Sequence, residues 1–144
     1  MQIGGPGFRI ANVHLQAAIA ESVSLRVLLT RYLHCASIQI AYTAYSNAVH
    51  QIEARLARWL LMCHDRTDGD DIELTHQFVG IMLAVRRQSV TDALHVLEGN
   101  NLILASRGFI TIRDRRGLRA LAGEAYGVPE HEYAANIGGL SHKN

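Results

Sequence analysis

The stretch THQFVGIMLAVRRQSVTDALHVLEGNN, from Thr75 to Asn101, decides the fold of this chain. Thr75 is suited to cap a first helix, whose apolar residues recur at helical spacing as Phe78, Val79, Met82 and Leu83. This helix stops at Ala84-Val85, and after Arg86 a second helix begins, with one apolar stripe made of Val90, Leu94 and Leu97. Two short helices joined by so few residues predict a helix-turn-helix.

Two segments rich in β-forming residues follow, at 102–105 and 109–112, and they flank Ser106-Arg107-Gly108. Gly108 can supply the positive φ of a hairpin turn, so these residues predict a β-hairpin. Residues 72–74 are a candidate short strand that pairs with this hairpin. The order helix, turn, helix, hairpin is that of a winged helix. We therefore expect a mainly α fold with the hairpin as its wing.

The outer face of the second helix is polar and carries Arg87, Gln88, Thr91, Asp92 and His95. An α-helix fits the major groove of B-DNA, where Arg can donate two hydrogen bonds to guanine and Gln can pair with adenine. An ordinary helical hairpin with a solvated polar face would show the same pattern. The pattern alone leaves both interpretations open.

The segment LTHQFVGIMLAVRRQSVTDALHVLEGNNLI, followed by RGFITIRDRRGL, is similar to the DNA-binding domain of Crp/Fnr-type transcription regulators. The upstream EARLARWLLMCHDR, Glu53 to Arg66, resembles the helix that leads into that domain, and the whole resemblance covers roughly Glu21 to Leu118. In this family a β-roll sensor domain precedes a dimerisation helix. Only about twenty residues precede that helix here, so we expect the sensor to be absent.

The apolar positions from Cys35 to Cys63 alternate three and four residues apart, which is a heptad seam and predicts a coiled coil. Such a stripe could also pack on its own domain. The resemblance implies both: the first part pairs with its twin, and after a hinge near Asn47 to His50 the second part packs inside the DNA-binding domain. We expect four regions: a lead with a short helix capped by Asn12 (1–22), a dimerisation helix opened by Ser24 (23–48), the winged helix-turn-helix domain (49–128) and a polar, frayed tail after Pro129 (129–144). Asp114 is expected to cap a last helix running through Leu118 to Ala125.

The resemblance places base-reading positions at the start of the second helix, whose expected range is Arg87 to Glu98. We expect Arg87 to contact guanine, Gln88 to read the neighbouring pair, and Asp92 either to accept from cytosine or to hold Arg87 or Gln88 in place. The remaining candidates would contact DNA bases or phosphate, and one of them, Arg107, lies at the expected wing tip. They are Thr75, His76, Gln77, Arg86, Ser89, Thr91 and Arg107. Arg113, Arg115 and Arg116 are expected to give electrostatic support.

Charge is unevenly distributed, although the net charge is only +1. Seven arginines lie between Arg86 and Arg119, against three acids, and this basic end coincides with the predicted helix-turn-helix and wing. Cys35 and Cys63 fall in helical apolar patterns, which favours buried thiols over a disulfide. No metal-ligand spacing, nucleophile motif or phosphate loop appears, so we expect neither enzyme activity nor a metal or cofactor.

These observations predict a cytoplasmic transcription regulator that binds double-stranded DNA at an inverted repeat as a homodimer through the helix Ser24 to Asn47, without contacting a membrane. RNA polymerase is a further candidate partner. One alternative is a protein-interaction or dimerisation module in which the winged helix has lost DNA binding. Another is a small-molecule sensor with a pocket between the heptad-lined helices.

Overall fold

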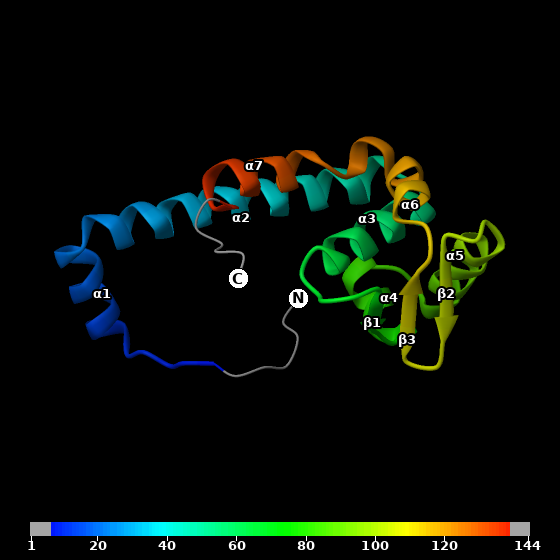
Figure 1. Cartoon of the computed structure of the whole chain (residues 1–144), viewed down its shortest axis with the longest axis horizontal. Coiled ribbons are helices and arrows are strands. Elements are labelled where there is room, and N and C mark those ends of the chain that lie inside the picture. The colour runs from blue at the N-terminus through cyan, green and yellow to red at the C-terminus, as the bar shows by residue number, and fades with distance from the viewer. Residues whose placement is uncertain (1–6, 139–144) are drawn as a thin grey trace.

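The computed structural model describes residues 7–138. Over these residues the chain forms seven α-helices, one 3-10 turn and a small antiparallel sheet (Figure 1). The elements in order are α1 (Asn12–Glu21), α2 (Val23–Val49), α3 (Ile52–His64), β1 (Asp71–Glu73), α4 (His76–Leu83), α5 (Arg87–Gly99), β2 (Ile103–Ser106), β3 (Phe109–Ile112), α6 (Arg115–Ala122), η1 (Gly123–Ala125) and α7 (Val128–Asn136). The expected mainly α, winged helix-turn-helix fold is confirmed.

The sheet has the strand order β1-β3-β2, and both pairs are antiparallel. Ile110 of β3 lies opposite Ile72 of β1 and Ala105 of β2. The expectation that the segment at 72–74 pairs with the hairpin is therefore confirmed. Gly108 has φ of 84°, as the hairpin turn requires, and Asn101 has φ of 56° after α5.

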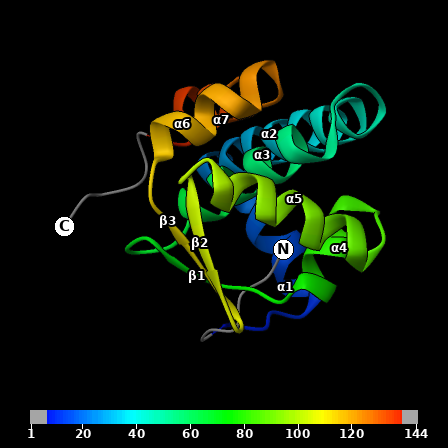
Figure 2. The same ribbon diagram turned by 90° about the vertical axis from the view of Figure 1, so that its right-hand side faces the viewer.

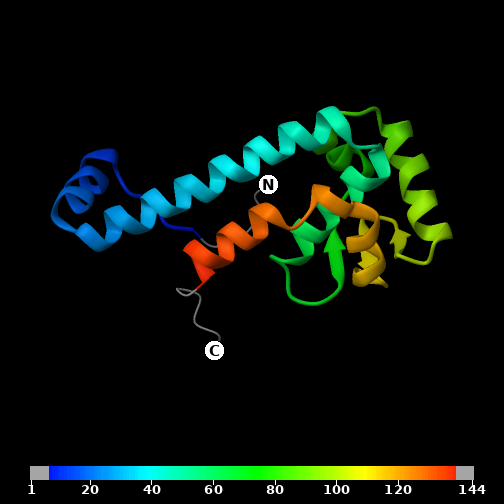
Figure 3. The same cartoon turned by 90° about the horizontal axis from the view of Figure 1, so that it is seen from above.

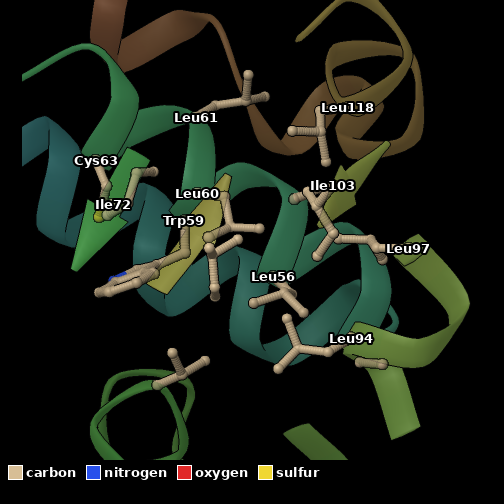
Figure 4. Close-up of a cluster of buried hydrophobic side chains, with 14 of the residues drawn as sticks. Leu56, Trp59, Leu60, Leu61, Cys63, Ile72, Leu94, Leu97, Ile103 and Leu118 are labelled. Atoms are coloured by element: carbon tan, nitrogen blue, oxygen red, sulfur yellow. The ribbon is translucent and has the colours of Figure 1, made fainter. Parts of the chain in front are cut away.

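The hydrophobic core is built around α3 (Figure 4). Leu56, Leu60 and Leu61 of this helix are fully buried, and they pack with residues of α5, α6 and the sheet that include Leu94, Leu97, Ile103 and Leu118. Burying each such side chain contributes roughly 1.5–3 kcal/mol. This core fixes α4, α5 and the wing as one unit.

The long apolar run does not form one continuous helix. His50 and Gln51 are extended, with ψ of 150° and 160°, and they separate α2 from α3, which turns back beneath α2 (Figure 1). The hinge expected near Asn47 to His50 is present at its C-terminal edge. The uninterrupted coiled coil suggested by the heptad spacing is wrong, because the seam residues beyond the hinge pack inside the domain. None of the described helices is long and apolar enough to cross a membrane.

The expected frayed tail after Pro129 is wrong over Val128–Asn136, which forms α7 and lies along α2 (Figures 1 and 3). Glu130 accepts a hydrogen bond from the Gly127 amide at 2.9 Å, which caps the start of the helix. The Cys35 thiol donates to the Glu132 carbonyl at 3.6 Å and ties the two helices together. Residues 139–144 of that expected tail lie outside the described part.

Three helix ends differ from expectation. Ala11, not Asn12, is the N-cap residue of α1, and it has no side-chain capping bond. Ser22 caps α2 in place of Ser24, by accepting from the Leu25 amide at 3.2 Å. Asp114 does cap α6, but this helix ends at Ala122 and continues only as the 3-10 turn η1.

Candidate nucleic-acid interface

The turn between α4 and α5 is tight and places the two helices in a fixed arrangement. The Thr75 hydroxyl accepts from the Phe78 amide at 3.2 Å, so α4 begins as expected, and Ala84 ends it in the left-handed conformation with φ of 52°. A Cβ atom on Gly80 would lie 3.1 Å from the Val85 carbonyl oxygen. Glycine at this position therefore lets the turn fold closely over α4.

Helix α5 buries one face and exposes the other. Val90, Ala93, Leu94 and Leu97 are buried against the core, which leaves the opposite face in solvent (Figure 2). On that face the Gln88 amide donates to the Asp92 carboxylate at 2.9 Å. In this structure the bond holds the Gln88 amide against the Asp92 carboxylate.

Hydrogen-bond donors that could bind an anion are concentrated at the start of α5. Arg86 is the N-cap residue and makes no side-chain capping bond, so the first backbone amides of the helix are open to an anion. Arg86 and Arg87 are exposed, and among residues 7–138 neither side chain has a hydrogen bond or ion pair. Ser89 is half-buried beside them. Two unpaired cations thus lie at the positive end of the helix dipole.

The candidates at the start of α4 are partly engaged within the protein. His76 Nδ1 lies 3.3 Å from the Thr91 hydroxyl, which also donates to the Arg87 carbonyl at 3.2 Å. The Thr75 hydroxyl is occupied by capping, while Gln77 is exposed. Thr75, His76 and Thr91 therefore position α4 against α5, and of these four residues Gln77 presents the freest side chain to a ligand.

The wing extends from the C-terminal end of α5, and Arg107 lies exposed in its turn (Figure 2). Arg115, in contrast, is engaged within the protein although its side chain is 43% exposed, because it donates to Asp65 at 2.5 Å. Tyr126 donates to the same carboxylate at 2.7 Å, and burial together with this bond raises the pKa of Tyr126 to about 12. Arg115 thus anchors α6 to the end of α3, whereas the exposed Arg113 and Arg116 have no side-chain hydrogen bond or ion pair among residues 7–138.

Sequence interpretation missed one apolar side chain at this surface. Ile81 of α4 is 69% exposed and borders a shallow hollow with Gln77, Arg86 and Arg87. The signal was present in the sequence, because Ile81 falls off the apolar stripe that Phe78, Val79, Met82 and Leu83 define.

Residues 54–121 match the family described as the Crp-like helix-turn-helix domain. The fold is similar to that of a CRP-family transcriptional regulator from Thermus thermophilus, with a TM-score of 0.61 and 23% identity over 68% of this chain and 53% of the other. A Crp/Fnr-family protein from Eubacterium rectale gives 0.58 and 20% over 74% and 49%, and a second Thermus thermophilus regulator, of the CRP/FNR family, gives 0.53 and 24% over 65% and 50%.

No curated protein matches the chain significantly. The chain spans about half the length of these solved structures. The three structural similarities establish the fold, and the family match shows that residues 54–121 also have the sequence pattern of this domain. This chain therefore contains a Crp-like helix-turn-helix domain, formed by residues 54–121.

Proposed function

We propose that this chain is a sequence-specific, DNA-binding transcription regulator in which α5, from Arg87 to Glu98, enters the major groove. The observation that carries the proposal is the pair of exposed, unpaired arginines at the start of α5, next to its polar face. Arg87 would contact guanine, and Arg86 and Ser89 would hold a phosphate with the open amides of the helix start. Arg107 at the wing tip would neutralise a second phosphate.

The bond between Gln88 and Asp92 supports a reading role for Gln88, since an oriented amide discriminates adenine better than a freely rotating one. Thr75, His76 and Thr91 would act by positioning, and Gln77 by contacting the DNA backbone. A docking surface for a protein would expose apolar anchors. The surface at the start of α5 does expose Ile81, but the polar or charged Arg87, Gln88 and Asp92 outnumber it, which favours DNA over a protein partner.

Homodimerisation is the second part of the proposal. Helix α2 leaves apolar side chains exposed along much of its length: Val27, Leu33, Tyr45 and Val49. A long helix with such a surface is stabilised by pairing, and a second copy through Ser24 to Asn47 would supply it. Two-fold symmetry would then place two α5 helices on an inverted repeat with half-sites roughly 34 Å apart.

The DNA proposal is tested by selecting bound duplexes from a random pool and titrating the enriched sequence by fluorescence anisotropy. We expect an inverted repeat, and Arg87→Ala should weaken its binding by about 1–3 kcal/mol while leaving affinity for random DNA nearly unchanged. Arg113→Ala, which removes an exposed arginine outside α5, is the matched control. Equal losses of Arg87→Ala on selected and random DNA would remove the base-reading role.

The dimer is tested by changing Leu33 and Tyr45 to Glu together. These side chains are 64% and 50% exposed, so the fold of one protomer should tolerate the change. Four apolar side chains would be lost per dimer, and at roughly 1.5 kcal/mol or more each the dissociation constant should rise more than about 100-fold. Sedimentation velocity measures this rise, with Leu33→Met and Tyr45→Phe as the paired control. A chain that is monomeric before any substitution would refute the dimer.

A further inference from the structure

A cavity of about 660 Å³ lies where α2, α3 and α7 face one another. Its walls include Tyr32, Gln39 and Ile40 of α2, Arg58 and Trp59 of α3, and Tyr133 of α7. This volume falls within the range of roughly 300–1,000 Å³ that is typical of small-molecule sites. The cavity is separate from the α5 surface, because no residue of α5 is among those that line it, although α4 contributes Met82.

Arg58 is the unusual group in this wall, because its side chain is only 3% exposed. Its Nε and Nη2 atoms are buried, and among the described residues they have no hydrogen-bond partner. Leaving a buried charged donor unsatisfied is costly. These two nitrogens form the edge of the guanidinium that donates two parallel hydrogen bonds to one carboxylate.

The acidic residue that interacts electrostatically with Arg58 is Glu130 at the start of α7. No ion pair within 4.0 Å joins the two in the part of the chain that the structure describes. One Glu130 oxygen accepts from the Gly127 amide, and the other is buried without a partner. Burial lowers the pKa of Arg58, Glu130 raises it, and Arg66 lowers it again. The charge of Arg58 is therefore not fully compensated by the protein.

A second cation borders the same cavity. Arg66, just beyond α3, donates to the Gln39 side chain at 3.2 Å and to the Met62 carbonyl at 2.6 Å, both neutral acceptors. Trp59, Ile40 and Tyr32 line the cavity with apolar surface. The lining thus combines two guanidinium groups with apolar walls, which suits an anion that carries an apolar body.

We propose that this cavity binds a small carboxylate with an apolar body. Its carboxylate pairs with Nε and Nη2 of Arg58, which are covered in this structure and become reachable through a change of the Arg58 rotamer. The apolar part then lies against Trp59 and Ile40, which are contributed by α3 and α2. These two helices make few direct contacts with each other. A ligand that touches both therefore restricts the angle between α2 and the winged helix-turn-helix. The angle between these two parts of the chain then depends on whether the metabolite is bound.

Trp59 offers a direct readout, because it is the only tryptophan of the chain and lies in the cavity wall. The full chain is titrated with hexanoate, acetate and hexanamide while tryptophan fluorescence is recorded. We expect a saturable change with hexanoate, and at least about tenfold weaker binding of acetate, which lacks the apolar body, and of hexanamide, which lacks the charge. Equal responses to hexanoate and hexanamide would overturn the proposal.

Two variants identify the site. Arg58→Gln should abolish the response to hexanoate, whereas Arg119→Gln, at an exposed position of α6, should leave it unchanged. If Arg58→Gln does not fold, Ala36→Phe carries the test, because it fills the cavity from α2 and leaves Arg58 in place. Hexanoate binding that survives both cavity variants would overturn the site. Absence of any hexanoate binding, with equal destabilisation by Arg58→Gln and Glu130→Gln, would assign Arg58 to a water-bridged structural pair instead.

Discussion

Replacing Arg107 with Gln should change how DNA binding depends on salt. Arg107 lies exposed at the wing tip and, within residues 7–138, forms no ion pair. Each neutralised phosphate contributes about 0.9 to the slope of log K against log salt, so two wings of a dimer contribute about 1.8. Between 50 and 200 mM salt the wild type should therefore lose about tenfold more affinity than the variant. Anisotropy titrations of a labelled inverted-repeat duplex at several KCl concentrations measure both slopes.

The matched control is Arg26→Gln, which removes the same charge near the start of α2. The 27 residues of this helix rise about 1.5 Å each, so its N-terminal end lies roughly 40 Å from the hinge. That separation is several Debye lengths at about 0.1 M salt, so the slope should not change. A slope reduced by only about 0.9 would mean that one wing binds per complex. An unchanged slope for Arg107→Gln would refute the phosphate contact.

Three further substitutions test local arguments. Ala84→Gly should stabilise the fold by about 1 kcal/mol in urea unfolding, because a residue with a Cβ is strained at φ of 52°; a loss of stability would contradict this. Asp92→Ala releases the Gln88 amide, so discrimination at one base pair should fall about tenfold in competition titrations, while an unchanged preference would show that the bond does not orient Gln88. Burial raises the pKa of the Cys63 thiol from 9.0 to about 12. The contribution of this thiol to the free energy of unfolding should therefore be fully present below pH 9 and be lost progressively up to pH 12, by about 2 kcal/mol at pH 10.5. Cys63→Ala should flatten this pH dependence, and parallel curves for both proteins would refute it.

The helix-turn-helix and wing could be predicted from sequence because each local signal agreed with the fold. The Thr75 cap, the left-handed Asn101 and the Gly108 turn all act within a few residues. The break between α2 and α3 carries no such signal. The apolar spacing continues through His50 without a shift, because residues before the hinge and residues after it use the same periodicity to cover different surfaces.

Helix α7 and the Arg58 cavity depend on contacts that are distant in sequence. Pro129 and Glu130 are typical of a helix start, but the short segment after them is stabilised by packing along α2 rather than by its own composition. Arg58 lies in an amphipathic stretch where an arginine is ordinarily exposed. Its side chain is buried and lies within the electrostatic influence of Glu130 at the start of α7, and the sequence near Arg58 gives no reason to expect either.

The hinge is the point where the proposed dimer and the DNA-reading surface would act on each other. Arg55, one turn into α3, donates from Nε to the Asn47 side chain at 3.1 Å and from Nη2 to the Leu83 carbonyl at the end of α4. One side chain thus links the last turn of α2 to the turn that positions α5. Because the domain below is tightly packed, rotation of α2 about His50 and Gln51 moves α4 and α5 together. In the proposed dimer, that rotation would set the distance between the two α5 helices, so the spacing of the two proposed half-sites would be decided at a hinge that contacts no base.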